Sequence, residues 1–248
     1  MAQEIIEIRT QDGVCPATVC TPSSGTEPWP AVIFYMDGLG IRQTLKNMAQ
    51  RIADEGFLVL LPDLYYRMGA YAPFDPTEIF ASGAFREKLG PYFASTNPQK
   101  AGVEDTRAFI AHLDTRGDVK GKKIAVTGYC MGGAIALTAA GTHPDRIAAA
   151  ASFHGGNLAS DAETSPHLLA PKIKAEVYVA AAVEDHSYPP EMEARLKQAF
   201  DAAHVNYRHE TYEGAKHGWT KADFPIYNRD AAERAHRELI ALFRRQLN

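Results

Sequence analysis

The 248-residue sequence has few cysteines, no large excess of either charge and no long apolar segment. Its three cysteines, Cys15, Cys20 and Cys130, are too few and too widely spaced for a disulfide framework. In a strand, residues 15 and 20 would point to opposite faces, so we expect no bridge between them. We therefore predict that Cys15 and Cys20 are small, buried apolar side chains.

A basic surface patch and a hydrophobic leader are also missing. The chain has 26 Lys and Arg against 30 Asp and Glu, a formal net charge of −4, and no local run of basic residues. It therefore offers no field that would hold a phosphate backbone, and nucleic acid is not an expected partner. The N-terminus lacks a basic region followed by an apolar stretch, and no apolar run is long enough to span a membrane. We expect a soluble, cytoplasmic protein without a membrane partner, as a monomer or small homo-oligomer.

Strand-like and helix-like segments alternate along the chain, which favours an α/β fold with a mostly parallel sheet and helices on both faces. The hydrophobic share of 46% allows a large core, and we expect residues 1–248 to form a single domain. The expected strands are residues 4–9, 14–21, 31–35, 57–61, 123–127, 147–153, 176–181 and 206–212. The expected helices are residues 42–55, 97–114, 131–142, 191–203 and 228–247. The proline- and aromatic-rich segment 62–96 should contain loops and short helices, a natural place for an element that covers a substrate.

A glycine-rich turn joins an expected strand to an expected helix, with the sequence Gly128-Tyr129-Cys130-Met131-Gly132-Gly133. It has the spacing of the G-x-S-x-G elbow, with cysteine in place of the serine nucleophile. Such a turn is so tight that the nucleophile has a strained backbone and its neighbours must lack side chains. At the helix N-terminus, free N–H groups favour a thiolate on Cys130, and the Met131 N–H can stabilise an oxyanion. The alternative is a structural turn with a buried thiol, or one that binds phosphate.

The partners of this nucleophile should follow it along the chain, first the acid and then the base. Asp185 follows one later strand and His217 follows the next. Because the carboxyl ends of parallel strands meet at one edge of the sheet, both loops should open beside Cys130. We predict that His217 is the base and that Asp185 orients its imidazole and stabilises the cation. The competing candidates are His186 and His154 for the base and Glu184 for the acid.

With these loops, the sequence resembles the dienelactone hydrolase family over most of the chain from Pro30 onward. Besides the elbow GYCMGG, the resemblance is carried by PDLYYR (62–67), AGVEDTRAFI (101–110) and YEGAKHGW (212–219). It implies an eight-stranded α/β-hydrolase fold, no cofactor or metal, and hydrolysis of a small carboxylic ester or cyclic enol lactone. The family's triad falls on Cys130, Asp185 and His217, the residues chosen above.

The family also places a carboxylate beside the resting thiol, and the matching residue is Asp37, where the family has Glu. An anion there would oppose thiolate formation until a substrate displaces it, so the resemblance makes Asp37 a modulator of the thiol. Aspartate is one methylene shorter, and a structural role in the turn is the alternative. In the same loop, the backbone N–H of Gly38, or of Leu39, is the expected second oxyanion donor.

Two arginines hold a substrate carboxylate in the family. One of these positions is Lys221 here, four residues after the proposed base, and Arg86 is the nearest candidate for the other. Lysine supplies a charge but not the bidentate fork of arginine, so we expect a different or weaker preference for carboxylates. The alternative for Lys221 is a solvated surface lysine.

These features together predict a cysteine-nucleophile hydrolase of small esters or lactones that acts through a thioester acyl-enzyme. Esters are expected rather than amides, because an amine leaves the tetrahedral intermediate poorly without strong protonation. The alternative function is non-catalytic, with the same fold binding a small molecule or sensing oxidants through Cys130.

Overall fold

The computed structural model describes residues 3–83 and 85–247, apart from the side chain of Arg86. Its eight strands form one sheet in the order β1-β2-β4-β3-β5-β6-β7-β8. In chain order they are β1 (Gln3–Thr10), β2 (Gly13–Cys20), β3 (Ala31–Tyr35), β4 (Leu58–Pro62), β5 (Ile124–Tyr129), β6 (Ile147–Phe153), β7 (Glu176–Ala182) and β8 (Tyr207–Tyr212). Strand β2 is antiparallel to both of its neighbours, and all other pairs are parallel. The expected eight-stranded, mostly parallel sheet is confirmed.

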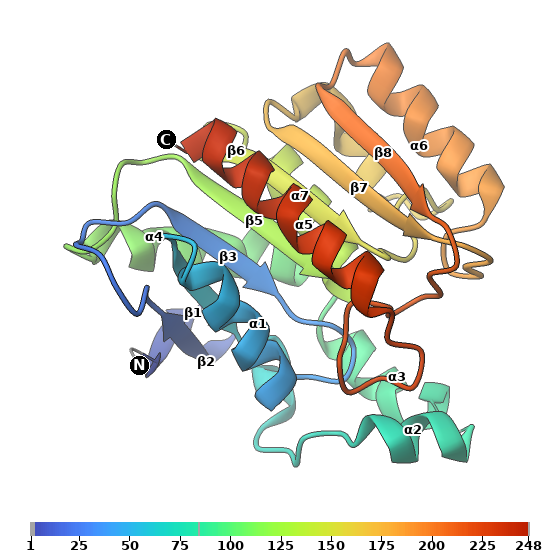
Figure 1. Cartoon of the computed structure of the whole chain (residues 1–248), viewed down its shortest axis with the longest axis horizontal. Coiled ribbons are helices and arrows are strands. Elements are labelled where there is room, and N and C mark those ends of the chain that lie inside the picture. The colour runs from blue at the N-terminus through green and yellow to red at the C-terminus, as the bar shows by residue number, and fades with distance from the viewer. Residues whose placement is uncertain (1–2, 84, 248) are drawn as a thin grey trace.

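Helices cover both faces of this sheet. They are α1 (Gln43–Ala53), α2 (Pro76–Ser82), α3 (Phe85–Ser95), α4 (Thr106–Thr115), α5 (Met131–Thr142), α6 (Pro190–Ala202) and α7 (Arg229–Leu247), with the shorter turns η1 (Tyr66–Met68), η2 (Pro98–Asp105) and η3 (Pro166–Lys172). Figure 1 shows α1 and α7 in front of the sheet and α4 and α5 behind it. Helices α2 and α3 lie apart from both layers, beyond the arrowheads of β3 and β5.

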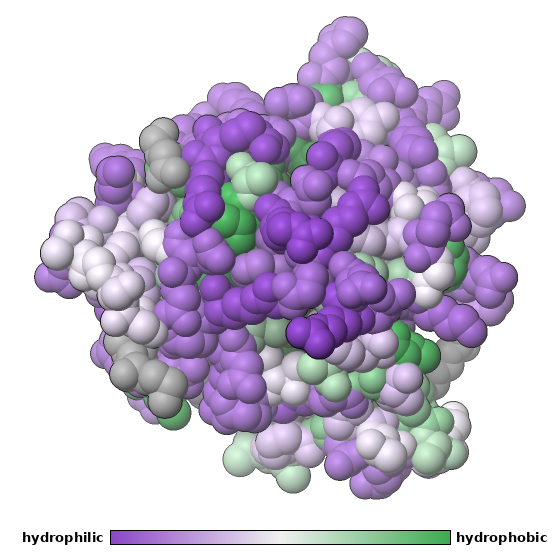
Figure 2. Space-filling model, in the orientation of Figure 1, coloured by the Kyte–Doolittle hydropathy of each residue, from purple (hydrophilic) through white to green (hydrophobic). Residues whose placement is uncertain are grey.

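Burial explains why the central strands read as continuous apolar runs in the sequence. Every residue of β3, β4 and β5 is buried, as expected for strands with helices on both faces. The face with α1 and α7 is predominantly hydrophilic on the outside (Figure 2). No helix in the described part of the chain is both long enough and apolar enough to cross a membrane.

The two N-terminal cysteines lie inside this core. Cys15 and Cys20 are both free and fully buried, as predicted. Burial raises the pKa of Cys20 to about 12, and it also raises the pKa of Cys15, so both thiols stay neutral at ordinary pH. Neither is therefore a candidate nucleophile.

The expected helix 97–114 differs from the observed structure. Asn97 caps it as expected, since its side chain accepts a hydrogen bond from the Lys100 N–H, but η2 is a π-helical segment before α4 begins. At the junction with α4, the hydroxyl of Thr106 donates to the Ala101 carbonyl of η2 at 2.7 Å and competes with the regular backbone pairing. A Cβ on Gly102 would lie 2.8 Å from Thr138 of α5, so close packing against α5 accompanies the irregularity.

Candidate active site

The turn between β5 and α5 holds the candidate nucleophile in a strained conformation. Cys130 has φ 55° and ψ −116°, a region that non-glycine residues rarely occupy. Its backbone N–H donates to the Phe153 carbonyl of the neighbouring strand β6 at 3.0 Å. The cysteine therefore stands at the carboxyl edge of the sheet and at the N-terminus of α5.

The glycines of the elbow allow this turn by removing side chains from two backbone contacts. A Cβ on Gly128 would lie 1.8 Å from the Gly132 carbonyl oxygen, and a Cβ on Gly132 would lie 2.4 Å from the Tyr35 carbonyl oxygen. Both obstacles are backbone atoms, which cannot rotate away. The steric requirement inferred from the motif is thus present in the structure.

His217 and Asp185 approach each other from the loops after β8 and β7. The Nδ1 atom of His217 lies 2.7 Å from Oδ2 of Asp185. The other carboxylate oxygen accepts hydrogen bonds from the Ser187 N–H at 2.9 Å and the Ser187 hydroxyl at 2.6 Å. Burial raises the pKa of Asp185, but the interactions with His217 and Ser187 outweigh it and lower the pKa overall. The carboxylate is therefore ionised and held in one orientation.

The charge on His217 depends on Cys130. Burial lowers the pKa of His217, but the negative charge and hydrogen bond of the Cys130 sulfur, together with Asp185, raise it to about 10. The imidazole thus lies close enough to the sulfur for its pKa to be affected, and it is hydrogen-bonded to the Asp185 carboxylate. This arrangement places the sulfur beside an imidazole that is oriented by a carboxylate, as nucleophilic catalysis by a cysteine requires.

The competing candidates for the acid and the base lie in environments that differ from those of Asp185 and His217. Glu184 and His186 are exposed, and neither has a hydrogen bond with His217 among the described residues. His154 is buried, and its Nε2 atom pairs with the Thr220 hydroxyl at 2.8 Å. Burial, and then the charges of Lys221 and His217, hold the pKa of His154 well below its usual value. A neutral His154 ring packs beside His217, with 5.1 Å between the ring centroids.

Cys130 and His217 open into a cavity of about 1120 Å³. Helices α2 and α3 line one part of it with Phe80, Phe85 and Phe93, and the loop 156–166 lines another. Met131 and Asp185 also border the space. A cavity of this size accommodates a small organic molecule next to the sulfur.

Comparison with known proteins agrees with this geometry. The sequence profile described as the dienelactone hydrolase family matches residues 15–247. The chain belongs to the dienelactone hydrolase family. A carboxymethylenebutenolidase of Pseudomonas putida is 26% identical over 238 residues, covering 95% of this chain and 94% of that protein. As a member of this family, the protein is a hydrolase of esters or lactones.

Solved structures agree on the fold. A crystal structure from Klebsiella pneumoniae has a TM-score of 0.83 and 22% sequence identity, and the match covers 98% of both chains. A dienelactone hydrolase-like promiscuous phosphotriesterase from metagenomic libraries has a TM-score of 0.75 and 23% identity, with 100% of both chains covered. At these identities the likeness supports the α/β-hydrolase fold alone.

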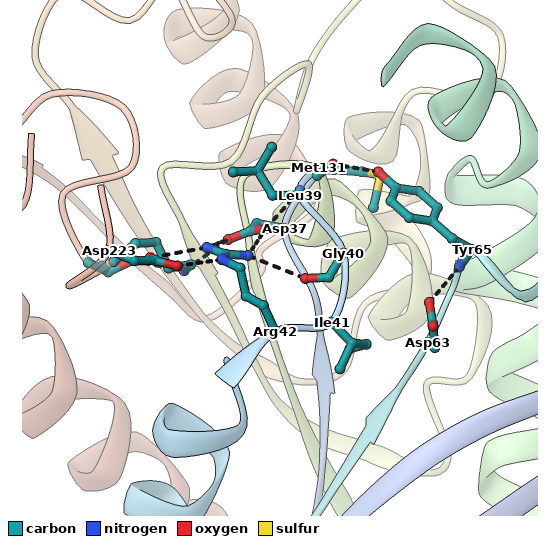
Figure 3. A network of polar contacts seen from close by, with 12 residues as sticks. Asp37, Leu39, Gly40, Ile41, Arg42, Asp63, Tyr65, Met131 and Asp223 are labelled. Atoms are coloured by element: carbon teal, nitrogen blue, oxygen red, sulfur yellow. Dashed lines mark hydrogen bonds and ion pairs between the residues drawn. The ribbon is translucent and has the colours of Figure 1, made fainter. Parts of the chain in front are cut away.

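The loop after β3 departs from the pattern expected of a dienelactone hydrolase. Asp37 is 1% exposed, and both of its carboxylate oxygens bind the Arg42 guanidinium, at 2.7 and 2.9 Å. Arg42 also donates through Nε to Asp223 at 2.5 Å, and Figure 3 shows the guanidinium between the two carboxylates. The sequence analysis did not select Arg42. Its spacing of five residues from Asp37 in the same loop could have suggested an ion pair between them.

This pairing bears on the predicted modulation of the thiol. The partners of the Asp37 carboxylate among the described residues are Arg42, the Leu39 N–H at 2.9 Å and Lys221 at 3.9 Å. The Cys130 thiol is not one of them. A carboxylate whose charge is compensated by a guanidinium opposes thiolate formation less than a free one. The modulating role of Asp37 therefore stays a prediction, with less physical support than the sequence suggested.

The same loop carries the expected oxyanion donors. The Leu39 N–H is already engaged by Asp37, which leaves Gly38 as the better second donor beside Met131. Tyr65, which sequence reasoning also missed, donates its hydroxyl to the Gly38 carbonyl at 2.8 Å and orients that peptide. Tyr65 is fully buried, and its hydroxyl lies 3.9 Å from the Met131 sulfur, beside it in Figure 3.

The two predicted substrate anchors are not part of the described cavity lining. The side chain of Arg86 lies outside the described residues, although its backbone belongs to α3. Lys221 is fully buried, so the alternative of a solvated surface lysine is wrong. Its Nζ lies 3.6 Å from the centroid of the Tyr129 ring and donates to the Thr220 hydroxyl at 3.0 Å. Contact between Lys221 and a substrate carboxylate therefore has no support in this structure.

Replacing Gly128 with alanine tests the packing of the elbow. The new Cβ would meet the Gly132 carbonyl oxygen at 1.8 Å, so Gly128→Ala should lower the free energy of unfolding by about 3 kcal/mol or more. Gly117→Ala is the control, because nothing lies within 4 Å of its added Cβ, and it should change stability by less than about 1 kcal/mol. Urea denaturation measures both, and equal effects would contradict the steric argument.

Removing the sulfur tests its influence on His217. In Cys130→Ala the interaction that raises the pKa of His217 is lost, so this pKa should fall from about 10. Titration of the imidazole resonances by NMR measures the shift. Cys20→Ala, which removes a buried thiol away from the site, should leave the pKa of His217 unchanged. An unchanged titration in Cys130→Ala would show that the sulfur does not charge the ring.

Buried Lys221 should make stability depend on pH. Burial lowers its pKa from 10.5 to about 7, with Asp37 acting in the opposite direction. Between these values the unfolded chain binds a proton that the folded chain does not, so unfolding becomes less favourable as the pH rises. From pH 7 to 10, wild type should therefore gain on the order of 3 kcal/mol relative to Lys221→Met.

Denaturation curves across this pH range measure that difference. Lys120→Met, which removes an exposed lysine, is the control for loss of one charge. A constant difference between wild type and Lys221→Met would mean that Lys221 is charged in the folded protein throughout the range.

Proposed function

We propose that this protein hydrolyses small carboxylic esters or lactones with Cys130 as the nucleophile, through a thioester acyl-enzyme. The observation that carries the proposal is that Cys130 and the hydrogen-bonded pair of His217 and Asp185 line the same cavity. Each member contributes a distinct physical property. The strained turn presents the sulfur, the imidazole holds the proton, and the carboxylate holds the imidazole.

In the first step, the Cys130 sulfur forms a bond to the carbonyl carbon of the substrate, and the carbonyl electrons move to oxygen. The N–H groups of Met131 and Gly38 are the proposed donors to this oxyanion. When the tetrahedral intermediate collapses, the bond from carbon to the leaving oxygen breaks. The imidazolium of His217 gives its proton to that oxygen, while Asp185 limits the energetic cost of the charge changes on the ring.

In the second step, water replaces the leaving group. Neutral His217 takes a proton from the water as its oxygen bonds to the thioester carbon. The carbon–sulfur bond then breaks, which releases the carboxylic acid and regenerates the thiolate–imidazolium pair. For a lactone, acid and alcohol remain in one molecule, so the product is a single hydroxy acid.

The proposal predicts that Cys130→Ala loses turnover of 4-nitrophenyl acetate by about 10³-fold or more. Wild type should also carry one acyl group on Cys130 when the reaction is quenched and analysed by peptide mass spectrometry. Cys20→Ala is the matched control and should retain both turnover and adduct, because its sulfur is buried away from the cavity.

Turnover near the wild-type rate in Cys130→Ala would refute the nucleophile assignment. Binding of small molecules without any acyl adduct, together with reversible oxidation of Cys130, would instead favour the non-catalytic, redox-sensing alternative.

A further inference from the structure

The cavity beside Cys130 has an aromatic wall. Phe80, Phe85 and Phe93 project into it from α2 and α3, the two helices that lie beyond the carboxyl ends of the strands in Figure 1. Phe80 keeps 43% of its surface exposed, so part of a large apolar side chain faces water beside the cavity. Apolar groups of a substrate would remove this surface from water.

These helices form a small hydrophobic cluster apart from the main core. Its buried members are Leu39, Ile79 and Leu89, and Phe85, Phe93 and Phe224 pack against them. The cluster thus includes Leu39 from the loop after β3, which also carries the proposed oxyanion donor. In the lower part of Figure 2, where this part of the molecule lies, several surface residues are hydrophobic and are coloured green.

Aromatic contacts join the wall to both proposed catalytic loops. The Phe93 ring lies 2.6 Å from the position of a Cβ on Gly38, so it covers that peptide directly. Phe80 packs edge-on against Phe224, with 5.0 Å between centroids, and Phe224 lies 2.7 Å from the position of a Cβ on Gly218. Gly218 follows the proposed base, so the wall is held at a defined place relative to the reacting atoms.

The charges around the cavity do not suit an anionic substrate. The described titratable side chains that line it are Cys130, Glu184, Asp185, His186, Lys216 and His217. Lys216 and Glu184 are both exposed, and Asp185 is engaged by His217. The buried basic side chains Arg42 and Lys221 are not in the lining and lie beside Asp37 instead. A substrate carboxylate would lose water here without an arginine fork among the described side chains to replace it.

From these observations we infer that the substrates are uncharged carboxylic esters with a bulky apolar acyl or alkoxy group. Phe80, Phe85 and Phe93 determine this specificity by covering the apolar group. The inference rests on the proposed function, because it assumes that the ester reacts at Cys130. It goes further by naming the substrate class and the residues that select it.

A matched pair of substrates tests the charge preference. The 4-nitrophenyl ester of glutaric acid carries a free carboxylate at its far end, and methylation of that carboxylate gives a neutral diester of nearly the same shape. After subtraction of spontaneous hydrolysis, kcat/KM for nitrophenol release should be about tenfold or more higher for the neutral diester. Equal values, or a preference for the anion, would overturn the inference.

Variants of the wall test the apolar preference. The ratio of kcat/KM for 4-nitrophenyl octanoate to that for the acetate should fall about tenfold in Phe80→Ala, and Phe80→Leu should restore much of it. Leu168→Ala is the matched control, because Leu168 is an exposed large apolar residue outside the cavity lining, and its ratio should equal that of wild type. Circular dichroism establishes that each variant is folded. Unchanged ratios in Phe80→Ala and in Phe85→Ala would overturn the assignment.

Two further variants separate failure of this inference from failure of the proposed function. If Cys130→Ala retains the turnover of both glutarate esters, the proposed nucleophile is wrong and the inference falls with it. If turnover depends on Cys130 but favours the monoanion, only the inference is overturned. Loss of that anion preference in Arg86→Gln would then identify Arg86 as the carboxylate anchor.

Discussion

The close approach of the β5 backbone to the first turn of α5 is the constraint on which the candidate site depends. Gly128 and Gly132 permit it, and Cys130 accepts a left-handed backbone as a result. This strain is balanced by a buried strand on one side and an almost entirely buried helix on the other. The turn aims the sulfur out of the sheet edge, where loops from two later strands can reach it.

Around this turn, the buried charges form two groups with different consequences. Cys130, His217 and Asp185 border the cavity, and Asp185 is hydrogen-bonded to His217. Asp37, Arg42 and Asp223 form a second group that is closed on itself, with Lys221 at its margin. The second group fixes the loop that carries Gly38, since Arg42 binds both that loop and Asp223.

The aromatic wall on α2 and α3 contacts the same loops. Its sequence predicted only loops and short helices, and the observed helices agree with that in type. The position of Phe93 against Gly38 and of Phe80 against Phe224 had no local signal, because each contact joins segments far apart in the chain. The composition of this segment therefore indicated an element that covers the substrate. Packing between distant segments placed its aromatic side chains beside the candidate active site.

The sequence by itself determined the order of strands and helices, the elbow and the three residues of the candidate triad. These follow from local sterics and from the rule that parallel strands end at one edge, which selected the candidates but left His154, His186 and Glu184 as alternatives. Only the tertiary structure decided that Arg42 pairs with Asp37, that Tyr65 holds the Gly38 peptide and that Lys221 is buried against Tyr129. Such contacts depend on which side chains from distant parts of the sequence are buried next to one another. Arg42 and Asp223, for example, are 181 positions apart. Local pattern carries no information on which distant residue completes such a contact.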